Sequence, residues 1–156
     1  MKELIIKASF DENGFIPKRN TGFGEDISPE LHLANLDPSA ASIAVVMDDL
    51  DIPFMESLNH WIIWNIPLMD TIPENIPYGQ VVKSLGNAVQ GVGYGKNRYR
   101  GPKQPVFIRS VHRYRFRVYA LDTVLDLRAS SKKAELTKAM EGHIVQQGEI
   151  VGRYKR

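Results

Sequence analysis

The chain has 156 residues, no cysteine, and 20 Lys and Arg against 18 Asp and Glu, for a formal net charge of +2. With 43% hydrophobic and 24% charged residues, this composition excludes a disordered chain, a collagen and a coiled coil. The lack of cysteine excludes disulfides and thiolate sites and is compatible with a reducing compartment. No apolar run approaches the roughly 18 residues that span a bilayer, and Met1–Phe10 has no cleavage site for secretion, so we expect a cytoplasmic protein without a membrane span.

A chain of this length favours one domain whose core needs no covalent support. No internal repeat and no Ser/Gly-rich or charged linker divides the sequence, so we predict a single domain over residues 1–156. Pro and Gly instead separate short runs that resemble strands. The first of these runs is Leu4–Phe10.

Two later runs, Ser42–Met47 and His60–Ile66, are nearly continuous apolar segments with many β-branched and aromatic residues. This pattern is typical of strands that are covered on both faces. We therefore expect both strands at the centre of a sheet.

Val111–Leu121 alternates in the manner of a strand with one buried face. His112, Tyr114 and Phe116 share the predicted core face, and Arg113 lies with the other arginines of the run on the opposite face. We expect this second face to be exposed to water.

The clearest helical pattern follows Ser130 and Ser131, either of which can cap the helix, and runs through Leu136 to Gly142. Periodicity leaves a short helix and a strand equally open for Ile144–Val151. Strands followed by a late helix favour a mostly β domain with one or two helices near the C-terminus.

The charges are segregated along the chain. Residues Asn20–Val82 include ten acids and no Lys or Arg, whereas Lys83–Ala120 includes nine bases and no Asp or Glu. Such blocks are typical of a nucleic-acid-binding segment or of segments that pair with each other after folding. Because the bases are dispersed and the total is near neutral, we expect pairing and no nucleic-acid partner.

Polar clusters lie at the ends of the predicted strands. Asp49 and Asp51 point the same way if the chain stays extended, and Pro53 follows them; the alternative is a solvated turn. His60 opens the most apolar strand, where it is either a ligand-binding group or a core histidine with a local partner.

The third cluster joins Gly101 and Pro102 to His112 and Tyr114 of the alternating strand. Alternation places the imidazole and the phenol where the core ends, and buried groups of this kind need partners. The glycine-rich stretch 91–95 is a weak nucleotide-binding signal, because neither a helical pattern nor Gly-Lys-Ser/Thr follows it.

In this order the motifs resemble the phosphatidylethanolamine-binding protein family, which includes the Raf kinase inhibitor proteins. The matching segments are the Asp49–Pro53 turn, His60-Trp61, Tyr99-Arg100-Gly101-Pro102, the His112–Asp122 strand and the Gly152-Arg153-Tyr154 ending. The resemblance covers most of the chain and is closest to the short bacterial and archaeal branch.

This resemblance implies a mostly β fold in which a large antiparallel sheet packs on a smaller sheet. It also implies a small cavity that binds phosphate-like anions. Carried over motif by motif, the cavity residues are Asp49, Asp51, Pro53, His60, Gly101, Pro102, His112 and Tyr114. The Ile52–Pro53 bond resembles one that the family often holds in the cis form.

The chemistry of these side chains fits an anion pocket. Four groups can donate hydrogen bonds to phosphate oxygens: the imidazoles of His60 and His112, the Tyr114 hydroxyl and the Gly101 amide. We expect Asp49 and Asp51 to orient the imidazoles and to favour their protonated form.

We therefore expect a non-enzymatic binding or regulatory protein that recognises a phospholipid headgroup, a small phosphorylated molecule or a phosphorylated protein segment, with a kinase or protease as a candidate partner. We assign no catalytic residue, no metal ligand and no cofactor. A metal-dependent or acid–base hydrolase that uses the two His and two Asp is an alternative, and so is a pure interaction module. The apolar run Val106–Ile108 is either a contact in a homodimer or part of the core.

Overall fold

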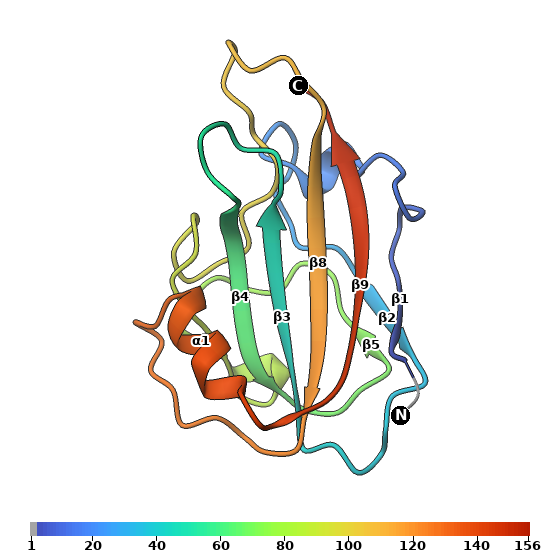
Figure 1. The fold of residues 1–156 in the computed structure, drawn as a ribbon, viewed down its shortest axis with the longest axis vertical. Helices are drawn as coiled ribbons and strands as arrows, with labels where there is room; N and C mark the ends of the chain where they lie inside the picture. The colour runs from blue at the N-terminus through green and yellow to red at the C-terminus, as the bar shows by residue number, and fades with distance from the viewer. Residues whose placement is uncertain (1–2) are drawn as a thin grey trace.

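Strands dominate the computed structural model, which describes residues 3–156 (Figure 1). The strands are β1 (Ile5–Lys7), β2 (Leu31–Ala34), β3 (Ser42–Asp49), β4 (Leu58–Ile66), β5 (Thr71–Ile72), β6 (Val81–Val82), β7 (Ala88–Gln90), β8 (His112–Leu121) and β9 (Ile144–Tyr154). The helices are α1 (Lys133–Met140) and two 3₁₀ turns, Lys18–Asn20 and Lys83–Leu85.

The strands form two antiparallel sheets. One has six strands in the order β6-β7-β4-β3-β8-β9, and the other has three strands in the order β1-β2-β5. One core cluster joins Ile6 and Leu33 of the small sheet to Met47 and Phe116 of the large sheet, so the two sheets pack on each other. The predicted mostly β fold, with a large sheet packed on a small one, is confirmed.

The middle of the large sheet is formed by β3, which lies between β4 and β8 and is buried along its whole length. Alternate residues serve two cores: Val45 belongs to the core between the sheets, and Val46 to a second core that includes Leu136 of α1. Each fully buried aliphatic side chain contributes about 1.5–3 kcal/mol to stability. The prediction that the apolar runs are central strands is confirmed.

The alternation of β8 is also confirmed on its core face, where Tyr114 and Phe116 pack between the sheets. The opposite face is only partly wet. Arg113 is exposed, but Tyr119 is buried in the second core with Met140 of α1. The helix covers this part of the face, which sequence alternation alone cannot show.

The helix begins later than its capping signal suggested. Lys132 is the N-cap and no side chain caps the helix, so the expectation of a Ser130 or Ser131 cap is wrong. The amide of Ser131 instead donates to the carbonyl of Arg128, which closes a turn ahead of the helix. The undecided segment 144–151 is part of β9, which pairs with β8 over nearly all of its length. No helix of residues 3–156 is long and apolar enough to cross a membrane.

This topology places three strand ends at one edge of the large sheet. In Figure 1 the end of β3 and the beginnings of β4 and β8 lie at the top, beneath the loops that connect them, while α1 covers the lower half. Antiparallel neighbours necessarily bring the end of one strand beside the beginning of the next. Asp49, His60 and His112 therefore meet at this edge, although the sequence separates them by up to 63 residues.

Candidate functional site

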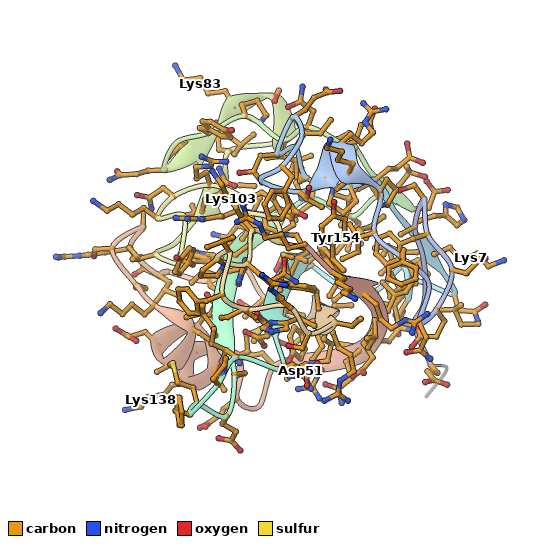
Figure 2. The ribbon with its side chains drawn as sticks, turned by 90° about the horizontal axis from the view of Figure 1, so that it is seen from above. Lys7, Asp51, Lys83, Lys103, Lys138 and Tyr154 are labelled. Carbon is orange, nitrogen blue, oxygen red and sulfur yellow. The ribbon has the colours of Figure 1, made fainter. Side chains whose placement is uncertain are left out.

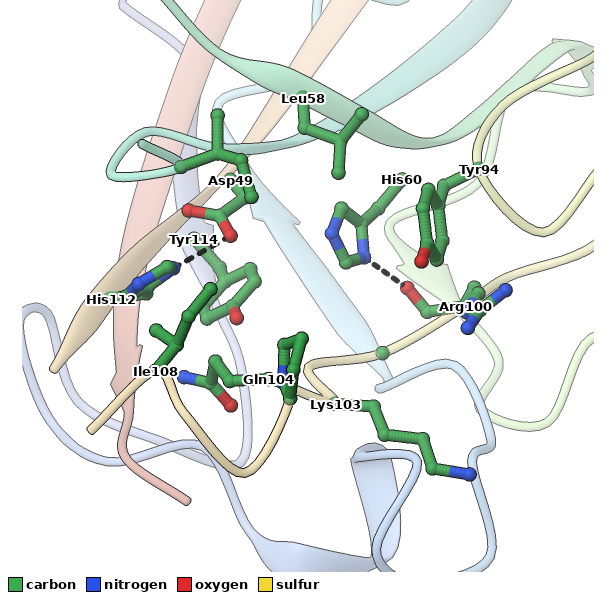
Figure 3. Close-up of a pocket in the computed structure, with 13 residues that line it drawn as sticks. Asp49, Leu58, His60, Tyr94, Arg100, Lys103, Gln104, Ile108, His112 and Tyr114 are labelled. Carbon is green, nitrogen blue, oxygen red and sulfur yellow. Dashed lines mark hydrogen bonds and ion pairs between the residues drawn. The ribbon is translucent and has the colours of Figure 1, made fainter. Parts of the chain in front are cut away.

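A cavity of about 140 Å³ opens at this edge of the sheet. Its wall is formed by side chains from the β3–β4 segment, from the start of β8 and from the loop 94–108, as Figure 3 shows. Five of the residues proposed from the sequence line it, namely Asp49, His60, Gly101, His112 and Tyr114. The structure therefore brings together four of the five segments that carry the family resemblance, all except the Gly152-Arg153-Tyr154 ending.

His112 and Asp49 form a buried pair in the cavity wall. The Nδ1–H group of His112 donates to Oδ2 of Asp49 over 2.8 Å, and the two residues are only 1% and 3% exposed. A proton held on Nδ1 by a carboxylate fixes the orientation of the ring and leaves the other nitrogen to serve a ligand. Within residues 3–156, that nitrogen, Nε2, is buried and has no hydrogen-bond partner.

His60 is held differently. Its Nδ1 lies 2.7 Å from the carbonyl oxygen of Arg100, its ring stacks on Tyr94 with 5.3 Å between centroids, and its ring meets Tyr114 edge-on. Burial lowers the pKa of His60 below its ordinary value, although the hydrogen bond to Arg100 and the charge of Asp49 act in the opposite direction. Figure 3 shows its second nitrogen pointing into the space between His60 and Tyr114.

Tyr114 supplies a phenol to the same space. Burial, followed by the negative charge of Asp49, raises the pKa of Tyr114 well above its ordinary value. The hydroxyl therefore keeps its proton at any physiological pH and can donate a hydrogen bond.

Two cations border the cavity. The guanidinium of Arg100 lies 3.9 Å from the centre of the Tyr94 ring, a cation–π contact that holds it at the mouth. Lys103 also lines the cavity, and Figure 3 shows its ammonium group extending outward. Over the described part of the chain, neither side chain forms an ion pair with a carboxylate. We call Arg100 and Lys103 the basic rim.

Gly101 lines the cavity but does not offer its amide to a ligand. Its N–H group donates to Oδ1 of Asp26 over 2.7 Å, so the expected donor role of this amide is wrong. A Cβ atom at this position would collide with the carbonyl oxygen of Asn20. The glycine is therefore needed for close packing of two backbone segments. Its neighbour Pro102 is buried outside the cavity lining, and its carbonyl accepts a hydrogen bond from Gly22.

Asp51 does not share the cavity with Asp49. Oδ1 of Asp49 accepts a hydrogen bond from the amide of Asp51 over 2.9 Å, and this turn ends the extended strand. The carboxylate of Asp51 binds the guanidinium of Arg113 at 2.8 and 2.9 Å, which lowers the pKa of Asp51. Seen from above in Figure 2, Asp51 lies apart from Lys103 of the basic rim.

Pro53, which follows this turn, also lies outside the cavity lining. Pro53 is exposed, and Ile52 lines the cavity in its place. No cis peptide bond occurs within the described residues, so the Ile52–Pro53 bond is trans and the implied cis bond is wrong.

Because Asp51 is turned outward, the two His and two Asp of the hydrolase alternative do not converge on one point. Across residues 3–156, no group of three or more His, Asp or Glu side chains is placed to hold a metal ion. The cavity instead includes residues that the sequence reasoning missed, above all Tyr94, Arg100, Gln104 and Ile108. The glycines around Tyr94 are a weak nucleotide signal in the sequence; in the structure, Gly93 packs directly against the backbone of His60.

Comparisons with known proteins bear on the family and the fold. The family model for "Phosphatidylethanolamine-binding protein" matches residues 6–155. Among named relatives, a UPF0098 protein of Pyrococcus horikoshii is 44% identical over 98% of this chain and 77% of its own length. A UPF0098 protein of Methanothermobacter thermautotrophicus is 41% identical over 95% of both chains.

Two crystal structures have the same fold. A phosphatidylethanolamine-binding protein homolog from Chlamydia trachomatis superposes with a TM-score of 0.85 at 29% identity, over 100% of this chain and 99% of that one. E. coli YbcL, described as a new member of the mammalian PEBP family, gives a TM-score of 0.83 at 23% identity over 99% of both chains.

Proposed function

Because the chain belongs to the phosphatidylethanolamine-binding protein family, in the branch of its bacterial and archaeal UPF0098 relatives, we propose that its cavity binds the phosphate group of a small molecule or of a lipid headgroup. The observation that carries this proposal is the unpartnered Nε2 of His112, buried in the wall while Asp49 holds the other nitrogen. A polar atom buried in this way needs a partner that the described residues do not supply. A phosphate oxygen is such a partner when the ring is protonated.

The charge around the cavity supports an anion. Arg100 and Lys103 border the mouth without carboxylate partners, and the Tyr114 hydroxyl adds a neutral donor inside. Cations that lack a partner raise the local concentration of an anionic ligand and hasten its association.

The size of the cavity limits how much of the ligand it encloses. Drug-sized ligands occupy pockets of roughly 300–1,000 Å³. A volume of about 140 Å³ accommodates a phosphate group and a few further atoms. The rest of the ligand would therefore remain outside, along the basic rim.

NMR titration of the imidazole resonances tests this proposal. Millimolar inorganic phosphate should shift the ring signals of His60 and His112, and His112→Ala should abolish the binding. His143 is a matched internal control, because its Nδ1 also pairs with a carboxylate, Asp122, at 2.7 Å but on the surface. If the His60 and His112 signals move no more than the His143 signal, the proposal is wrong.

The loop that contains Val106 and Phe107 exposes apolar side chains next to the cavity, which supports a contact with another protein chain. Val106 and Phe107 are 64% and 79% exposed, so their interpretation as core residues is wrong, and we propose them as a contact in a homodimer. Light scattering at two concentrations tests this contact. The particle mass of the Phe107→Asp variant should be lower than that of the wild-type protein. An unchanged mass excludes the loop as the contact. A kinase or protease stays a proposed partner of the same surface.

A further inference from the structure

We propose that the cavity prefers an anion that still carries an acidic proton, because His60 presents a hydrogen-bond acceptor to the ligand. This inference rests on the proposed phosphate site and names the class of ligand within it. It replaces the expectation that both imidazoles act as donors. It separates phosphate and phosphate monoesters, which can carry a P–OH group, from phosphodiesters and sulfate, which cannot.

The hydrogen bond between His60 and the Arg100 carbonyl determines which nitrogen of the ring carries the proton. A carbonyl oxygen can only accept, so the proton of this 2.7 Å bond must be on Nδ1 of His60. In a neutral imidazole only one nitrogen carries a proton, and Nε2 is then a lone pair. Because Figure 3 shows this nitrogen directed into the cavity, a ligand there meets an acceptor.

The surroundings of His60 keep the ring neutral. Charged and titratable groups surround it from every neighbouring element: Asp49 from β3, His112 and Tyr114 from β8, and Tyr94 and Arg100 from the loop, while Asp48 of β3 acts on it only through its charge. Burial is the largest influence and the charge of Arg100 adds to it; together they outweigh the hydrogen bond to the Arg100 carbonyl and the two carboxylates, and they lower the pKa of His60.

The nearby carboxylates are also engaged elsewhere. Oδ2 of Asp48 lies 2.7 Å from the ammonium of Lys133 on the far side of the sheet, and Oδ2 of Asp49 accepts from His112. Neither carboxylate forms a hydrogen bond with His60. The contrast between the two imidazoles therefore comes from their partners: His112 is held by a charged acceptor and His60 by a neutral carbonyl.

A ligand with a P–OH group can bond both to the hydrogen-bond acceptor and to the hydrogen-bond donors that line the cavity. Its proton donates to Nε2 of His60, while its charged oxygens receive hydrogen bonds from Tyr114 and the basic rim. Sulfate places an oxygen lone pair against the lone pair of His60, and the hydrogen bond is lost. The same is true of a phosphodiester. A buried hydrogen bond to a charged group corresponds to roughly a tenfold to hundredfold change in affinity.

The direct test compares inorganic phosphate with sulfate on the wild-type protein by isothermal calorimetry at pH 7.5. Both are tetrahedral anions, but only phosphate keeps a proton at this pH. We expect sulfate to bind at least about tenfold more weakly. Equal affinity for the two anions overturns the inference and leaves the proposed phosphate site intact. If neither anion binds, the proposed function itself fails.

A second comparison identifies the source of the phosphate group. At pH 6.5 part of phosphoethanolamine, a monoester, still carries a proton on its phosphate group, because the second pKa of a phosphate monoester is near 6. Glycerophosphoethanolamine, a diester with the same amine, has no such proton. We expect the monoester to bind more tightly at pH 6.5 and to lose at least about tenfold in affinity by pH 8. Tighter binding of the diester would indicate a lipid headgroup and overturn the inference.

Two variants locate the selectivity in His60. In His60→Gln the side-chain amide can turn its NH₂ group towards the anion, so sulfate should gain affinity and the ratio of phosphate to sulfate affinity should fall towards one. Lys103→Gln removes a charge from the rim, and Lys103 is not among the groups that shift the pKa of His60, so both anions should weaken in parallel and the ratio should hold. An unchanged ratio in His60→Gln contradicts the inference. The wild-type comparison decides the matter even if this variant folds poorly.

Discussion

Asp49→Asn tests the buried pair that organises the cavity. Asp49 accepts two hydrogen bonds through separate oxygens, one from the amide of Asp51 at 2.9 Å and one from Nδ1 of His112 at 2.8 Å. Asparagine has one acceptor oxygen, so its NH₂ group must face one of these two donors. Losing a buried hydrogen bond to a charged group, and leaving its donor without a partner, costs about 2–4 kcal/mol.

That loss is large compared with the roughly 5–15 kcal/mol that stabilises a typical domain. For a chain of this size it corresponds to a decrease of roughly 5–15 °C in Tm. Urea unfolding followed by tryptophan fluorescence measures it directly, because Trp61 and Trp64 are fully buried in the folded protein.

Asp51→Asn is the matched control for this measurement. Asp51 also binds a basic partner, Arg113, through two side-chain contacts, but that pair is on the surface. An exposed pair of this kind contributes about 1 kcal/mol or less. If Asp49→Asn leaves the free energy of unfolding within about 0.5 kcal/mol of wild type, the carboxylate does not hold His112 and the reasoning about Nε2 fails.

Two further predictions concern the neighbouring residues. Gly101→Ala should destabilise the fold by about 1–3 kcal/mol, because the added Cβ meets the carbonyl of Asn20; an unchanged urea midpoint would show that the two segments can separate freely. For His60, burial lowers the pKa below its ordinary value of 6.5, so the unfolded chain takes up a proton at a higher pH than the folded protein. The contribution of His60 to stability is therefore complete above pH 6.5 and is lost as the pH falls below it. The pH dependence of stability between pH 6.5 and pH 5 should be shallower in His60→Gln, and an identical slope would exclude His60 as its source.

The sequence predicts the framework well where periodicity and burial act together. The apolar runs that became β3 and β4 lie at the centre of the large sheet, and the alternation of β8 assigns Tyr114 and Phe116 to the core correctly. The helix over Leu136 and Met140 is also found, although it begins later than its capping signal suggested. These features depend on local spacing, which a single sequence contains.

The site is predicted less completely, because its details depend on contacts between distant segments. Asp49 and Asp51 are two residues apart, which suggests that their side chains share a face of the strand. In the structure the Asp49 carboxylate accepts a hydrogen bond from the Asp51 amide, and this bond turns the chain. The sequence suggests that the amide of Gly101 is available to a ligand, but in the structure this amide donates a hydrogen bond to Asp26, a residue far away in the sequence. The backbone carbonyl of Arg100 accepts a hydrogen bond from His60, and a pattern of side chains in the sequence cannot predict such a backbone contact.

Ion pairs between the two charge blocks of the sequence neutralise some of the bases but not those of the basic rim. Across the described chain, Asp26 pairs with Arg98, Asp48 with Arg115 and Asp51 with Arg113, each pair joining an acid of the first block to a base of the second. These pairs neutralise bases on the sheet and beneath the loops. Arg100 and Lys103 lie at the cavity mouth and have no such partner. The near-neutral total is therefore compatible with a local positive potential at the cavity, because these pairs leave the two cations of the basic rim without a carboxylate partner.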